Sequence, residues 1–153
     1  MTEQEQQLVR QIKDAFAGVT LGKGIGLWEG NGLDDYADDA TMSEYRQKDE
    51  RINWLAIPVD DLNFCHSSLS YLDAEGMRFL LPAYLVADLE GTLTSVEIIW
   101  HLGYQLDTMK LCFEILSPAQ RGVIREHLLL RRANPHYEFH YPLIESALSV
   151  FQG

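Results

Sequence analysis

MRFLLPAYLVADL, residues 77 to 89, is apolar on nearly every side when the segment is drawn as a helix. A helix of this kind is normally surrounded by other helices, so the segment predicts the central helix of an all-α fold. Asp73 precedes it in the position of an N-cap. Pro82 should kink the helix or divide it in two, because proline removes one backbone hydrogen bond.

Amphipathic helices are predicted on both sides of this central segment, since apolar residues recur there at three- to four-residue spacing. The clearest start signal is Ser117-Pro118-Ala119-Gln120, a capping serine followed by proline at the first helical position and glutamine at the third. The other predicted helices are one from Thr2 to about Gly18 that buries Leu8, Ile12 and Phe16, one from Pro58 that buries Leu62, Cys65, Leu69 and Leu72, one capped by Ser95, and a last one from Pro142.

The N-terminal third carries glycines in a dense run between residues 22 and 32. Each glycine costs about 1 kcal/mol in a helix interior, so this run predicts a loop. An acidic, polar segment follows as far as Arg51, with one short helix around residues 33–40. We therefore predict a single helical domain over residues 1–153, an all-α bundle of about six helices with a glycine-rich, acidic N-terminal loop region.

Composition and net charge disfavour several classes of function. The 153 residues are 46% hydrophobic, as in a globular protein, and their net charge of −11 disfavours binding to nucleic acid or to an anionic membrane. No apolar stretch reaches the roughly 20 residues of a membrane helix, and the polar, acidic start is unlike a signal peptide. Cys65 and Cys112 lie in apolar helical patterns, which favours free, buried thiols. We expect a cytoplasmic protein, monomeric or homodimeric, whose charged partner is basic.

Two segments carry a family resemblance: the run from Leu69 to Tyr84, which contains Leu81-Pro82-Ala83-Tyr84, and the later Leu116-Ser117-Pro118-Ala119-Gln120. This pattern resembles a family of small bacterial proteins known as a domain of unknown function. In that family a Leu-Pro-Ala-Tyr segment follows an aspartate-capped turn, and a second capped helix has glutamine at the matching position. The resemblance covers roughly residues 54–130. It implies a fold, and it assigns no catalytic residue.

Negative charge is concentrated between Glu29 and Asp61, where ten acidic residues face three basic ones for a net charge of −7. Three interpretations remain open: a solvated face that promotes solubility, a docking surface for a basic partner, and a divalent-metal site. The spacing does not match the calcium-binding loop of an EF-hand, which makes metal the weakest of the three.

Histidines and arginines supply two further candidates. His136 and His140 share a face in a helix or a strand and could ligate zinc, but Tyr137 stands where a metalloprotease motif has glutamate, and the flanking prolines favour a packed connecting segment. The predicted helix after Ser117 carries His127, expected to be partly buried with a hydrogen-bond partner. It also carries a basic face, which either pairs within the chain, with Glu126 or the acidic segment for example, or binds a small anion; its members are Arg121, Arg125, Arg131 and Arg132.

The sequence contains no complete catalytic motif, so we expect a protein that is not an enzyme and assign no catalytic residue, metal or cofactor. The function that charge and size favour is an immunity protein that inhibits a cognate bacterial toxin with a basic active-site surface. The alternative is a metal-dependent enzyme or regulator that uses the acidic cluster or His136 and His140. Partner binding is assigned to Asp34, Asp35, Asp38, Asp39 and Glu44, with Trp28 and Tyr36 as aromatic anchors.

Overall fold

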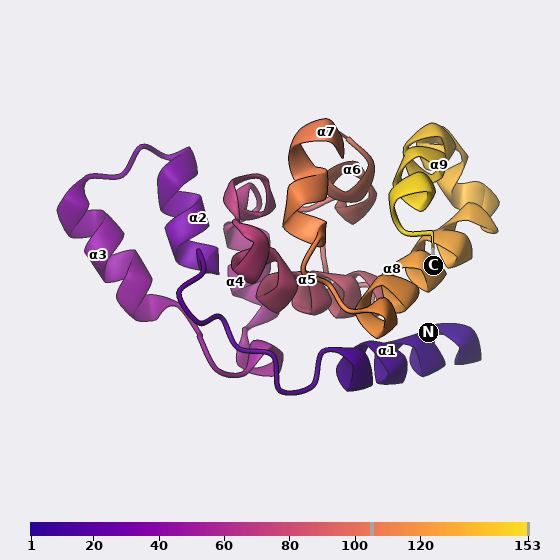
Figure 1. Cartoon of the computed structure of the whole chain (residues 1–153), viewed down its shortest axis with the longest axis horizontal. Coiled ribbons are helices and arrows are strands. Elements are labelled where there is room, and N and C mark those ends of the chain that lie inside the picture. Colours follow the sequence, from indigo (N-terminus) through magenta and orange to yellow (C-terminus); the bar gives the residue numbers. More distant parts are fainter. Residues whose placement is uncertain (105, 153) are drawn as a thin grey trace.

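The computed structural model describes residues 1–104 and 106–152, and over these residues the chain forms helices and turns without a strand (Figure 1). The all-α prediction is confirmed, although the helical segments are shorter and more numerous than the six or so predicted. They are α1 (Glu3–Ala15), α2 (Leu27–Asp34), α3 (Asp39–Lys48), η1 (Trp54–Ala56), α4 (Val59–Phe64), η2 (Ser68–Tyr71), α5 (Ala74–Leu89), α6 (Ile98–Gly103), α7 (Leu106–Met109), η3 (Lys110–Phe113), α8 (Pro118–Arg132), η4 (Pro135–His140) and α9 (Tyr141–Val150), the η segments being 3₁₀ helices.

The central helix is α5, as predicted, and nearly all of its side chains are buried. Asp73 caps it, with its Oδ1 atom accepting from the backbone N–H of Gly76 at 2.9 Å. The helix continues through Pro82 and is not divided there. It ends in a Schellman motif, in which Gly91 has a φ of +76° and the N–H of Thr92 donates to the carbonyl of Ala87 at 3.0 Å.

Helices α1 and α8 lie side by side, with α1 beneath α5 and α8 beneath α9 in the view of Figure 1. Both begin with a complete capping box, because the side chains of Thr2 and Glu5, and of Ser117 and Gln120, satisfy each other's backbone N–H groups. These starts were predicted from local sequence alone and are confirmed. The apolar stripe of α1 is buried against α8 and α5.

Two predicted helices differ from the observed ones. The helix expected from Pro58 to Leu72 breaks at Cys65 into α4 and η2, yet all four residues predicted for its buried face are buried. Ser95 does not cap α6. Glu97 does, because its Oε1 atom accepts from the backbone N–H of Ile99 at 3.1 Å. In the described part of the chain, no helix is both long enough and apolar enough to cross a membrane.

The largest correction concerns the glycine-rich region. Residues 27–32, predicted as a loop, form most of α2, and residues 39–48, in the predicted polar segment, form α3. The single short helix predicted around residues 33–40 is not observed, because residues 35–38 form the turn between α2 and α3. Of the glycine-rich run, only residues 22–26 remain outside a helix. The helices form because glycines allow α2 to approach its neighbours closely: a Cβ added at Gly30 would lie 3.1 Å from the Cβ of Ser68. Tertiary contact therefore outweighs the low helix propensity of glycine.

Candidate functional site

Helices α2 and α3 form a hairpin at one end of the long axis of the molecule, opposite α9 (Figure 1). Helix α2 packs on η2, whereas α3 makes its main contacts with α2. Met42 is the single buried residue of α3. The outer face of the hairpin is thus open to solvent, and this is the part of the chain that carries most of the residues assigned to partner binding.

Tyr36 lies in the turn between the two helices and is 94% exposed. The turn closes α2 with a Schellman motif, because the N–H of Ala37 donates to the carbonyl of Gly32 at 2.9 Å and that of Tyr36 to Leu33 at 3.4 Å. Tyr36 occupies the left-handed position of this motif, with a φ of +53°, where glycine is usual. A tyrosine in this conformation costs about 1–3 kcal/mol. Because the side chain is almost fully exposed, its contacts with described residues offset little of that cost.

Four aspartates surround Tyr36 in sequence. Asp34 is half-buried, and Asp35, Asp38 and Asp39 are exposed. None of the four forms an ion pair with a described residue. Asp38 also caps α3 by accepting from the N–H of Thr41 at 2.8 Å, and this bond lowers the pKa of its carboxyl group. We call Asp34, Asp35, Tyr36, Asp38 and Asp39 the hairpin tip.

Two residues assigned to the same surface lie away from the hairpin tip. Glu44 is exposed farther along α3. Trp28 is at the opposite end of α2, where its ring lies 5.5 Å from that of Tyr45 and 5.3 Å from that of Phe64, with the ammonium of Lys48 4.4 Å from its centre. Trp28 therefore packs in a half-exposed aromatic cluster that joins the hairpin to α4, and the structure does not bring it together with Tyr36.

Other carboxylates of the acidic region stabilise the local structure. Glu29 pairs with Arg46 at 3.1 Å. Asp49 is buried and caps α2, accepting from the backbone N–H groups of Trp28 at 2.6 Å and Glu29 at 3.3 Å. Burial raises the pKa of Asp49 to about 6, against the lowering effect of these two bonds. Glu50 accepts from the N–H groups of two following residues. The uncompensated negative charge of the hairpin is consequently concentrated at its tip and on Glu44.

His136 and His140 lie on η4, at the other end of the molecule. They line a cleft of about 500 Å³ together with Asp88, Glu97 and Tyr137. The Nε2 atom of His140 is 3.3 Å from a carboxylate oxygen of Glu97. Over residues 1–104 and 106–152, no group of three His, Cys, Asp or Glu side chains is placed to hold a metal ion. The segment connects α8 to α9, as its prolines favour, but the prediction that it is packed is wrong for most of its length, because none of its residues is buried.

A buried polar network lies beneath this cleft, and we call Glu5, Asp88, His127 and Arg131 the Asp88 network. One carboxylate oxygen of Asp88 accepts from Nε2 of His127 at 2.7 Å and from Arg131 at 3.0 Å. Arg131 also reaches Glu5 at 3.5 Å. Burial alone raises the pKa of Asp88, but the hydrogen bonds and charges of His127 and Arg131 outweigh burial and lower it.

Local sequence patterns predicted this network only in part. His127 and Arg131 are one helical turn apart and were expected, respectively, to have a hydrogen-bond partner and to belong to a basic face. Intramolecular pairing is confirmed for Arg131, and Arg132 pairs with Glu145 at 2.6 Å. The suggested partners, Glu126 and the acidic segment, are not the ones used. Asp88 could not be chosen in advance because it is 39 residues from His127.

A family model, described as a family of unknown function (DUF6714), matches residues 4–136, and the chain belongs to this family. The match includes the hairpin tip and the Asp88 network and ends within η4. No curated protein and no solved structure matches the chain. No activity is assigned to this family, so any function proposed for the chain rests on its geometry.

Proposed function

We propose that this member of the family is a non-enzymatic binding protein, an immunity protein that neutralises a cognate bacterial toxin in the cytoplasm. Its single helical domain, as a monomer or a homodimer, would dock through the hairpin tip onto the basic active-site surface of the toxin. Glu44 extends the negative surface along α3. The cognate toxin is inhibited because the docked hairpin covers its active site, which requires no chemistry from the inhibitor.

The observation that carries the proposal is Tyr36, a 94% exposed aromatic side chain held in a backbone conformation that favours glycine. Exposed tyrosines are common among the residues that dominate binding energy at interfaces. Backbone strain of this kind concentrates at functional positions. Here it holds the ring at the outer end of a hairpin, where a partner can reach it from several sides.

The surrounding charge supports the choice of a basic partner. The hairpin tip carries four carboxylates, and the whole chain has a net charge of −11. Complementary potentials accelerate encounter and fix the orientation of the partners. Tyr36 would then provide the buried centre of the interface, and the aspartates would form its charged rim. The attraction between this rim and the partner becomes weaker as the salt concentration is raised.

The experiment measures complex formation between the full chain and the product of the neighbouring gene, together with inhibition of that product. We expect a complex whose dissociation constant rises at least about tenfold in Tyr36→Gly and in the double variant Asp35→Asn/Asp39→Asn. Tyr36→Gly also relieves the backbone strain, so weaker binding by this variant cannot be attributed to unfolding.

Matched controls lie outside the hairpin. Phe139 on η4 is 89% exposed, and Phe139→Ala removes an aromatic ring of similar exposure. Glu114→Gln/Glu138→Gln removes two exposed carboxylates that form no ion pair within the described chain. Both controls should bind as the parent does. Absence of a complex, or equal loss of affinity in the tip and control variants, would contradict the proposal.

A further inference from the structure

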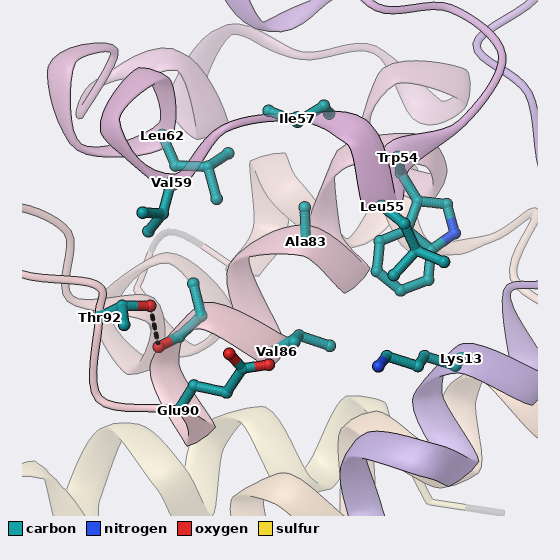
Figure 2. A pocket seen from close by; sticks show the side chains of 11 residues that line it. Lys13, Trp54, Leu55, Ile57, Val59, Leu62, Ala83, Val86, Glu90 and Thr92 are labelled. Atoms are coloured by element: carbon teal, nitrogen blue, oxygen red, sulfur yellow. Dashed lines mark hydrogen bonds between the residues drawn. The ribbon is translucent and has the colours of Figure 1, made fainter.

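A second cavity, distinct from the hairpin and from the cleft above Asp88, lies between α1, η1, α4 and α5 (Figure 2). Its volume is about 270 Å³, just below the ~300 Å³ at which pockets for drug-sized ligands begin. Eight of its eleven lining residues are apolar, while polar atoms make up more than half of the surface that the cavity exposes. Its principal side chains are Trp54, Leu55, Ile57, Leu62, Ala83 and Val86, and we call it the Trp54 cavity.

The inner wall of this cavity is fixed by the core. Trp54 is buried, and its indole N–H donates to the carbonyl of Phe16 at 3.1 Å. Leu62 and Ala83 are also buried members of the hydrophobic core. Leu55, by contrast, is more than half exposed at the rim. A preformed apolar wall with an accessible rim is typical of a small-molecule site.

Two opposite charges border the cavity. Lys13, in the last turn of α1, and Glu90, the C-cap of α5, both extend toward it from opposite sides (Figure 2). Neither forms an ion pair with the other or with any residue in the described ranges. The negative end of the α5 dipole adds to the potential of Glu90. One side of the cavity therefore favours a cation and the other an anion.

We propose that the Trp54 cavity binds a free α-amino acid with an apolar side chain. The α-ammonium group donates to Glu90 at the end of α5, the α-carboxylate accepts from Lys13, and the side chain enters the cavity against Trp54. A small zwitterion complements both charges at once, whereas a fatty acid or an alkylamine leaves one of the two side chains without an oppositely charged partner. This site is separate from the proposed inhibitor surface and does not depend on it.

The test uses leucine as the probe and the full chain in isothermal titration calorimetry. N-acetylleucine removes the positive charge of leucine, and leucinamide removes the negative charge. We expect leucine to bind with the highest affinity and each derivative to bind about threefold to tenfold more weakly, as exposed charge pairs allow. The tripeptide Gly-Leu-Gly is a further probe, because its internal leucine carries neither an α-ammonium nor an α-carboxylate group. We expect it to bind more weakly than either derivative.

Two variants assign each charge to its residue. In Lys13→Met, leucine and leucinamide should bind equally well, while N-acetylleucine remains weaker. In Glu90→Gln, leucine and N-acetylleucine should bind equally well, while leucinamide remains weaker. Both positions are exposed, so the variants should fold as the parent does.

Three outcomes would overturn the inference: no saturable binding at millimolar leucine, equal affinity for the three compounds, or the same order of affinities in both variants. Tight binding of Gly-Leu-Gly would also overturn it, and would point to a peptide segment of a partner in place of a free amino acid. These results leave the inhibitor proposal untouched, because Lys13 and Glu90 lie outside the hairpin tip that its variants address.

Discussion

At the scale of single residues, the position of a carboxylate along the backbone decides whether it caps a helix or remains exposed. Asp73 accepts from the N–H of Gly76 at 2.9 Å and from that of Ile25 at 3.0 Å, so one side chain caps α5 and also fixes the segment that leads into α2. Asp49 caps α2 from 21 residues away. Asp35 and Asp39 make no such backbone contact in the described structure, and they are therefore free to meet a partner.

Asp49 should make stability depend on pH. Its pKa is raised from 3.8 to about 6 by burial, so the folded state holds a proton that the unfolded chain has already lost between these values. The contribution of Asp49 to the free energy of unfolding is therefore highest below about pH 4 and falls as the pH rises to about 6. We expect a loss of roughly 1 to 3 kcal/mol across this window from Asp49 alone.

Urea titrations of the parent and of Asp49→Asn at several pH values measure this contribution. Asparagine keeps an acceptor for Trp28 but does not titrate, so the stability advantage of the parent over the variant should shrink between pH 4 and pH 6. Comparing the two proteins removes the opposite trend from Asp88, whose lowered pKa stabilises the fold above its titration and is lost in acid. A constant difference between parent and variant would be inconsistent with a raised pKa at Asp49.

At the scale of secondary-structure elements, α2 shows how glycines can build a helix that their propensity disfavours. Gly30 faces Ser68 of η2, and the hydroxyl of Ser68 donates to the carbonyl of Leu27 at 2.6 Å. Gly32 faces α3, where an added Cβ would lie 2.9 Å from the sulfur of Met42 and 2.9 Å from the ring of Tyr45. Close packing on two neighbours replaces the side-chain contacts that the glycines lack.

Gly32→Ala should separate α2 from α3. Overpacking of this kind costs about 1–3 kcal/mol, more than the roughly 1 kcal/mol that alanine gains over glycine in a helix. Hydrogen exchange should show faster exchange of the amides of the hairpin, with little change in α5. Because the hairpin tip depends on the angle between these helices, affinity for the proposed partner should fall as well.

Gly122→Ala is the matched control for this substitution. Gly122 lies in the second turn of α8 and is exposed, and an added Cβ there would meet nothing within 4 Å. The same chemical change should stabilise the protein by roughly 0.5–1 kcal/mol through helix propensity alone. If both alanine variants were stabilised equally, the close approach of α2 and α3 would not be a constraint on the fold.

At the scale of the whole molecule, the Asp88 network connects parts of the chain that local sequence does not relate. Arg131 of α8 reaches Glu5, 126 residues away in α1, as well as Asp88 in α5. Its guanidinium group also lies 4.8 Å from the ring centre of Tyr137 in η4. Four elements therefore meet at one nearly buried arginine.

Arg131→Met should destabilise the whole chain. The substitution leaves the partly buried carboxylate of Asp88 with His127 as its remaining partner, and removing one member of a buried ion pair costs about 3–5 kcal/mol, less where water reaches the remaining charge. We expect a loss of roughly 2–4 kcal/mol in chemical denaturation, shared by probes in α1 and α8.

Arg132→Met is the control, since Arg132 is next to Arg131 in sequence but pairs with Glu145 at the exposed surface. Exposed ion pairs contribute little, so this variant should unfold at nearly the same denaturant concentration as the parent. Similar destabilisation by both substitutions would show that burial of the network does not determine its contribution.

The sequence by itself determined the features that arise from neighbouring residues. The capping boxes at Thr2 and Ser117 fixed the starts of α1 and α8, and the continuous apolar run after Gly76 identified α5 as the buried centre. The same is true of the concentration of acidic residues around Tyr36. These signals depend on hydrogen bonds within one helical turn or on the period of a helix, and both can be counted along the chain.

Only the tertiary structure decided the rest, because the interactions concerned join distant residues. Glycine propensity argued for a loop at residues 22–32, and packing against Ser68 and Met42 made residues 27–32 part of a helix. Trp28 and Tyr36 were predicted to share one surface, but the length of α2 places Trp28 at the other end of the helix. Asp88 pairs with Arg131, and Lys13 and Glu90 border one cavity, because of the way in which the helices pack against each other. Local sequence patterns do not predict this packing.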